Sequence, residues 1–158
     1  MRLAGEISFK PFFMNAKQIH RLLRVAYPLC LDIPRPKKHI SIILYKGRIE
    51  AIGSNQLKTH PEAVKHGYLF GEMHSELDAF LKLGDRKRGL TLFNIRFNRF
   101  GQMRMARPCF RCMPWCVGCF DEIWYTTDEG VMLHGEGLSP INTRSIKEIL
   151  NEKVHPIS

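Results

Sequence analysis

Two short motifs, far apart in the sequence, constrain this chain more than any other feature. A His-Ser-Glu tripeptide occupies positions 74–76, and a Pro-Cys-Phe-Arg-Cys pentapeptide occupies positions 108–112. His74, Cys109 and Cys112 offer one imidazole and two thiolates, which are three ligands for a tetrahedral zinc ion with the fourth position left for water. One ion binds all three only if the fold brings the segments together, so we expect the motifs to begin two helices whose N-termini converge.

Glu76 and Pro108 distinguish this pattern from a purely structural metal site. Zinc lowers the pKa of a water ligand towards ~7, and Glu76 follows His74 closely enough to move protons without binding the metal. Pro108 suits the first turn of a helix, whose positive end favours the thiolates of Cys109 and Cys112. A lone Cys-x-x-Cys would also fit a redox pair or half of a structural zinc site. The two motifs together indicate hydrolysis at a zinc centre.

Length and composition are those of one globular domain, so residues 1–158 are expected to form a single unit. No apolar run approaches the ~20 residues of a membrane helix, and residues 1–6 do not resemble a secretory signal. Four of the five cysteines lie within residues 109–119, which suits a thiolate metal site in a reducing compartment better than a disulfide framework. The sequence therefore predicts a cytoplasmic protein with no membrane partner.

The charge of the chain points to an anionic partner. The net charge is +9, a balance that favours nucleotides or nucleic acid. Arginines gather in the approach to the second motif, at Arg96, Arg99, Arg104, Arg107 and Arg111. Arginine holds phosphate through paired hydrogen bonds. We therefore take Arg104 and Arg107 as candidates to bind a substrate phosphate.

Hydrophobic periodicity predicts an alternation of helices and strands. A helix over 15–27 is expected to be capped by Asn15 and ended by Pro28. Strands are expected at 39–45, 48–53, 90–97, 122–127 and 131–134, helices after residues 74 and 108 and at 145–151, and a loop over 53–66. This order predicts an α/β sandwich with a mixed five-stranded sheet.

The motifs and their order resemble the cytidine deaminase superfamily, and within it the cytidine/deoxycytidylate deaminases, over about residues 38–135. The resemblance implies a three-layer α/β/α sandwich in which His74, Cys109 and Cys112 bind Zn²⁺ and a zinc-bound hydroxide is the nucleophile. It also implies that Glu76 protonates the ring nitrogen and passes protons to the leaving ammonia.

The same resemblance implies two substrate contacts. Members of the family place an asparagine in a Gly-x-Asn context against the sugar, and Gly53-Ser54-Asn55 matches this pattern, so Asn55 is the candidate sugar contact. The small residue between the histidine and the glutamate directs a backbone amide towards the base. Here that residue is Ser75, in place of the commoner alanine.

The chain departs from the family pattern in two further places. Pro114 lies shortly after the last zinc ligand and is expected to kink or shorten its helix. The connection at 127–130 is too short for a crossover helix, so the last two strands are expected to form an antiparallel hairpin. That connection looks more like the nucleoside deaminases than the deoxycytidylate or nucleic-acid-editing branches.

Three further sets of residues have a functional and a structural interpretation. His60 lies in the loop that holds Asn55, and is either a substrate contact or an ordinary loop residue. Phe110 adjoins a zinc ligand and is the aromatic candidate to stack on a base, although most aromatics belong in the core. Cys116 and Cys119 form a second Cys-x-x-Cys, which we expect to be small core residues rather than a structural zinc site.

Three functions remain open from the sequence. The favoured one is zinc-dependent deamination of a free cytosine nucleotide or nucleoside to the uracil form. The alternative is a deaminase acting on bases within single-stranded DNA or RNA, held by the cationic surface. A zinc-stabilised binding protein is a poorer fit, because such a protein has no need of Glu76. By analogy with the family, we also expect a homo-oligomer.

Overall fold

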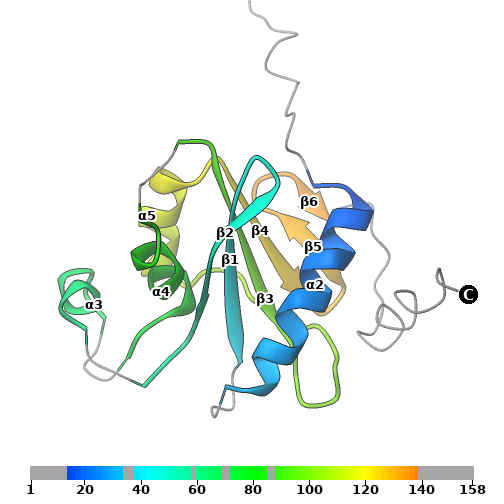
Figure 1. The fold of residues 1–158 in the computed structure, drawn as a ribbon, viewed down its shortest axis with the longest axis horizontal. Coiled ribbons are helices and arrows are strands. Elements are labelled where there is room, and N and C mark those ends of the chain that lie inside the picture. The colour runs from blue at the N-terminus through cyan, green and yellow to red at the C-terminus, as the bar shows by residue number, and fades with distance from the viewer. Residues whose placement is uncertain (1–13, 34–37, 58–59, 69–71, 85–87, 139–158) are drawn as a thin grey trace, which may run out of the picture.

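The protein forms a six-stranded sheet with helices on both faces (Figure 1). The computed structural model describes residues 14–33, 38–57, 60–68, 72–84 and 88–138. The helices are α2 (Ala16–Leu31), α3 (Pro61–Lys65), α4 (Ser75–Leu81) and α5 (Cys112–Cys119). The strands are β1 (His39–Tyr45), β2 (Arg48–Ser54), β3 (Leu90–Arg96), β4 (Glu122–Thr127), β5 (Gly130–Leu133) and β6 (Gly137–Leu138).

The sheet is mixed, in the order β2-β1-β3-β4-β5-β6. Only the pair β3–β4 is parallel among these neighbours, and the other four pairs are antiparallel. In Figure 1, α2 covers one face of the sheet, while α4 and α5 cover the other. The predicted three-layer sandwich and its five strands are confirmed, and the two-residue β6 extends the sheet beyond β5. The helix expected at 145–151 lies outside the described residues.

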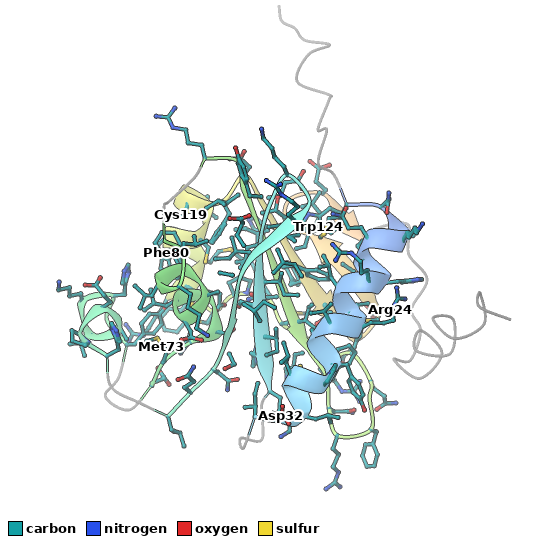
Figure 2. The ribbon with its side chains drawn as sticks, in the orientation of Figure 1. Arg24, Asp32, Met73, Phe80, Cys119 and Trp124 are labelled. Atoms are coloured by element: carbon teal, nitrogen blue, oxygen red, sulfur yellow. The ribbon has the colours of Figure 1, made fainter. Side chains whose placement is uncertain are left out.

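Alternation along the central strands divides the core into two apolar clusters. Ile42 and Phe93 pack in the cluster with α2, whereas Ile43 and Leu92, their neighbours in sequence, pack in the cluster with α4 and α5. Successive strand side chains point to opposite faces, which is why adjacent residues serve different layers. Figure 2 shows the same division, with Trp124 on the α2 side.

Helix α2 is longer than expected. Its start is as predicted, because the Asn15 side chain accepts a hydrogen bond from the backbone N–H of Gln18 at 2.9 Å. The expected end at Pro28 was wrong, since the helix continues to Leu31 with the proline inside it. Pro28 is exposed, while Ala26 and Cys30 are buried against the sheet. This packing maintains the last turn despite the hydrogen bond that proline removes.

Two other local expectations also need correction. The segment 53–66 contains the short helix α3, with Pro61 in its first turn, where a missing N–H costs nothing. Helix α5 begins at Cys112 rather than near Pro108. Pro114 therefore falls in the first turn of α5 and need not kink it.

Strands β4 and β5 form the expected antiparallel hairpin, with Thr127 paired to Gly130. No helix among the described residues combines the length and apolar character that crossing a bilayer requires.

Candidate metal centre

The two sequence motifs meet where α4 and α5 begin. His74 is the N-cap residue of α4, and its side chain makes no capping bond, which leaves the ring nitrogens for other partners. Its Nδ1 lies 3.4 Å from Cys112 Sγ and 3.6 Å from Cys109 Sγ. The three ligand atoms all lie within 4.8 Å of one another. The fold therefore brings together the three side chains that were predicted from the sequence to be metal ligands.

The geometry and chemistry of this cluster fit zinc. Bond lengths of about 2.3 Å to sulfur and about 2.05 Å to nitrogen, at a tetrahedral angle, separate a sulfur and a nitrogen ligand by about 3.5 Å. The two S–N distances above lie within about 0.2 Å of that value. Cys112 is fully buried, and this burial raises the pKa of its thiol. A thiolate at that position therefore needs a cation beside it.

Glu72 orients the histidine, and no motif in the sequence indicated this role. Its Oε1 lies 3.1 Å from His74 Nε2. A carboxylate there accepts a hydrogen bond from Nε2–H, which leaves Nδ1, the ring nitrogen near the two sulfur atoms, with its lone pair free to bind a metal. Pairing of this kind is common behind metal-binding histidines.

Glu76 is buried and held by Asn94, a residue that sequence reasoning missed. The Asn94 Nδ2 group donates to Glu76 Oε2 at 2.8 Å and to the backbone carbonyl of Ala106 at 3.2 Å. The Ser41 hydroxyl donates to Asn94 Oδ1 at 2.6 Å. Because Oδ1 only accepts, this bond fixes the amide with its nitrogen towards the carboxylate.

Strand register places this polar network under α4. Ser41 on β1 is the direct cross-strand partner of Asn94 on β3, and both are buried. Ser75 joins them from the helix, with its Oγ 2.8 Å from Ser41 Oγ and 3.4 Å from Glu76 Oε1. A polar residue within each of two apolar strands is the signal that could have revealed the network in advance.

Gly53 allows α4 to lie directly on β2. A Cβ atom at this position would lie 2.3 Å from the backbone nitrogen of Ala79 and 2.4 Å from the carbonyl oxygen of Ser75. Such distances leave no room for any side chain at this position. The close packing of α4 on β2 therefore explains the glycine of the Gly-x-Asn motif. The buried Asp78 carboxylate then accepts from the backbone N–H of Ser54 at 3.0 Å and fixes the end of the strand.

A pocket of about 340 Å³ opens onto the cluster. Its lining residues come from both motifs and from the strand ends: His39, Asn55, Glu72, Met73, His74, Ser75, Glu76, Arg107 and Cys109. Three of the predicted substrate contacts, Asn55, Ser75 and Arg107, thus border the same space. A larger hollow of about 610 Å³ between α2 and β2 includes Asn55 but none of the three ligands.

The other three predicted contacts are not among the described residues that line this pocket. His60 caps α3, because its Nδ1 accepts from the backbone N–H of Glu62 at 3.1 Å. Arg104 donates to Gln102 Oε1 at 2.9 Å and to the carbonyl of Met103. Phe110 is 80% exposed, with the Arg111 guanidinium 5.3 Å from its ring centre.

The remaining cysteines divide between core and surface. Cys116 is buried as expected, but Cys119 is exposed, so its assignment to the core was wrong. Among the described residues, the one group of histidine, cysteine or acidic side chains placed to hold a metal is His74, Cys109 and Cys112.

Comparison with known proteins finds similarity of structure and not of sequence. No protein-family model matches the chain, and no curated protein matches it. The solved structure of dCMP deaminase from the cyanophage S-TIM5 in complex with dCMP and dUMP matches with a TM-score of 0.51 and 17% identity, over 72% of this chain and 83% of that chain. The apo form of the same deaminase gives a TM-score of 0.47 and 19% identity, over 71% and 84%.

The match is one of fold, since the identity is low. The match covers most of both chains, although a short hairpin joins β4 and β5 in this chain. The chain has a cytidine/deoxycytidylate deaminase-like fold.

Proposed function

We propose that this protein is a zinc-dependent deaminase that converts a free cytosine nucleotide, of the dCMP type, to the uracil form. The observation that carries this proposal is the position of Glu76, buried in the wall of the pocket that also holds His74 and Cys109. A zinc ion held by His74, Cys109 and Cys112 would supply Lewis acidity that activates water for hydrolysis.

Glu76 is the proton carrier in this proposal. Its carboxylate accepts one proton from the attacking water and donates it to the ring nitrogen, then carries the second proton of that water to the leaving ammonia. Asn94 holds Oε2, which fixes the plane of the carboxylate relative to the pocket. A general acid–base group works best when its orientation is set before the substrate arrives.

The pocket also has groups suited to the rest of a nucleotide. Asn55 borders it and is the candidate sugar contact, and Ser75 lies at the start of α4, where its backbone amide would face the base. Arg107 is exposed at the same pocket and suits a 5′-phosphate. The cyanophage enzyme of similar fold was solved with dCMP and dUMP, which supports a nucleotide in preference to a nucleoside.

One observation favours the alternative substrate, a base within single-stranded nucleic acid. Phe110 adjoins the ligand Cys109, is 80% exposed and carries the Arg111 guanidinium over its ring. Exposed aromatics next to arginine are typical stacking platforms for unpaired bases. The free nucleotide is preferred because Arg107, which lines the pocket itself, would meet a single phosphate there.

A competition assay separates the substrates. Zinc-loaded protein receives deoxycytidine, dCMP and a cytosine-containing single-stranded oligonucleotide together, and mass spectrometry follows deamination. We expect conversion of dCMP. Conversion of the oligonucleotide alone would make the protein a nucleic-acid editor, and conversion of none would remove the proposal.

Replacing Glu76 tests the mechanism. Glu76→Gln keeps the shape and hydrogen-bonding reach of the side chain but removes its proton-accepting carboxylate. We expect zinc content to stay at the wild-type level while turnover falls about 1,000-fold, the scale of general acid–base catalysis. Turnover within about tenfold of wild type would overturn the assignment.

Two arginine variants test the phosphate. Arg107→Ala should raise the KM for dCMP and leave the KM for deoxycytidine unchanged, because only dCMP carries the anion. Arg104→Ala is the matched control, since its guanidinium bonds to the 102–103 segment and does not line the pocket. Equal effects of the two variants would remove phosphate binding from the proposal.

A further inference from the structure

Tyr68 contacts two of the three candidate metal ligands. Its hydroxyl oxygen lies 2.6 Å from Cys112 Sγ, and its ring lies against the His74 imidazole with 4.4 Å between centroids. The side chain is buried, at 4% exposure. No step of the proposed reaction uses Tyr68, and it is not among the described residues that line the pocket.

The donor in each of the two hydrogen bonds of the Tyr68 hydroxyl can be identified from its partner. The indole Nε1–H has no acceptor capacity, and it donates to the Tyr68 oxygen at 3.1 Å. Cys112 must be a thiolate to bind a metal, and a thiolate has no hydrogen to give. The Tyr68 hydroxyl hydrogen therefore points to Cys112 Sγ, which completes a chain from Trp115 through Tyr68 to the sulfur.

The fold holds Tyr68 in this position from two directions. Helix α3 ends in a Schellman motif, in which the backbone N–H of Tyr68 donates to the carbonyl of Ala63 and Gly67 adopts a φ of 86°. On the other side, the Trp115 ring packs against Phe80, with 5.5 Å between centroids. The short helix that the sequence did not predict is thus what delivers the tyrosine to the metal ligands.

We propose that Tyr68 is a positioning residue of the metal centre, whose hydroxyl, held by Trp115, donates to the Cys112 thiolate and tightens metal binding. The inference rests on the zinc site of the proposed function, although not on its substrate. A charge-assisted hydrogen bond to a thiolate ligand fixes the orientation of its sulfur towards the metal position. Outer partners of this kind affect metal affinity about 10- to 100-fold.

The test measures the zinc dissociation constant by competition with a chromophoric chelator. Tyr68→Phe removes only the hydroxyl and keeps the ring against His74. We expect this variant to bind zinc about tenfold or more weakly than wild type. Trp115→Phe removes the indole N–H but leaves the tyrosine hydroxyl, so its loss should be smaller than that of Tyr68→Phe.

Tyr125→Phe is the matched control. Tyr125 is also a buried tyrosine in the cluster with α4 and α5, and its hydroxyl donates to a sulfur at 3.3 Å, but that sulfur belongs to Met132. Its zinc affinity should equal that of wild type. Thermal unfolding of the metal-free proteins is compared in parallel, so that a general loss of folding is recognised.

The outcomes separate the proposals. Zinc affinity of Tyr68→Phe within about twofold of wild type, or an equal loss in Tyr125→Phe, overturns the role of Tyr68. If Tyr68→Phe does not fold, an unchanged affinity in Trp115→Phe overturns it instead. A wild-type protein that binds zinc but deaminates no cytosine substrate removes the proposed function, while the affinities still decide the role of Tyr68.

Discussion

The two faces of the central sheet differ in what they bury. Against α2, the sheet presents an apolar surface made of residues such as Ile42, Phe93 and Trp124. Against α4, the same strands present Ser41 and Asn94, which are bonded to one another. The two faces derive from alternate residues of the same strands, so each strand contributes to stability on one side and to the candidate site on the other.

The difference shows how a small domain holds a buried acid–base group. Burying a carboxylate without partners in an apolar core lowers the free energy of unfolding by several kcal/mol. A buried polar network with unpaired groups is also less stable than apolar packing in the same place. The α4 face meets this requirement by giving Glu76 a bond from Asn94 and by bonding Asn94 at both ends. The α2 face has no such requirement and contributes its burial to the free energy of folding.

The largest expected effect comes from Gly53, where β2 touches α4. The Cβ added by Gly53→Ala would overlap three backbone atoms of α4, and backbone cannot move aside as a side chain can. We expect the free energy of unfolding to fall by about 3 kcal/mol, and turnover to fall as well, because α4 follows the candidate metal ligand His74 and carries Glu76 in its first turn. Urea unfolding and a deamination assay measure the two effects.

Gly84→Ala is the control for that substitution. Among the described residues, no atom beyond the chain neighbours lies within 4 Å of a Cβ built at Gly84, so the unfolding free energy of this variant should change by less than about 0.5 kcal/mol. Similar losses at both glycines would mean that backbone flexibility, and not the approach of α4 to β2, explains the effect.

The next prediction compares Asn94 and Ile95, neighbours on β3 whose side chains face opposite layers. Asn94→Leu keeps the side-chain size but removes the bond to Glu76, so turnover should fall about 100-fold through misplacement of the carboxylate. Stability should fall by about 1–3 kcal/mol, since Ser41 and the carbonyl of Ala106 lose their partner.

Ile95→Val removes a single methylene from the α2 face. Its unfolding free energy should fall by about 1 kcal/mol, with the turnover of the folded protein unchanged. Kinetics and urea unfolding of both variants give the comparison. Equal losses of turnover at the two positions would show that the faces are not functionally separate.

The last expected effect appears only at high pH and concerns Cys30, a buried thiol in the cluster with α2. Burial, chiefly, raises the pKa of Cys30 from 9.0 to about 12. The neutral thiol is favoured in the folded state, so its contribution to stability is complete below pH 9.0 and is lost as the pH rises towards 12. By about pH 10 the loss should be about 1.4 kcal/mol.

Cys30→Val lacks the titrating group, so its unfolding free energy should fall less between about pH 8 and about pH 10 than that of wild type. Parallel urea titrations at the two pH values measure this difference. Identical changes in unfolding free energy between the two pH values in the two proteins would show that Cys30 is not buried as a neutral thiol.

Much of the fold follows from local patterns. The strand β1 is an apolar, β-branched run, and Asn15 is a helix N-cap, so both were predictable from sequence. The convergence of His74 with Cys109 and Cys112 was also predictable, because those residue types are consistent with one metal centre. Local propensity failed at Pro28, where packing of α2 against the sheet outweighs the cost of an interior proline.

Most supporting residues of the site were not predictable, and for Asn94 the one signal was a polar residue within an apolar strand. Glu72, Tyr68 and Asn94 belong to no motif, and each is defined by a partner distant in sequence or by a contact that only folding creates. Asn94 is opposite Ser41 because of strand register, and Tyr68 reaches Cys112 because α3 ends at Gly67. Long-range register and the direction of a chain after a cap depend on the whole fold.

The sequence by itself therefore determined which atoms are available to hold a metal and to move a proton, because ligand chemistry depends on residue type and short-range spacing. The tertiary structure alone decided how those atoms are oriented. It supplied the carboxylate behind His74, the amide behind Glu76 and the phenol behind Cys112, since hydrogen bonds between distant segments form only when the sheet and its two helical layers are assembled.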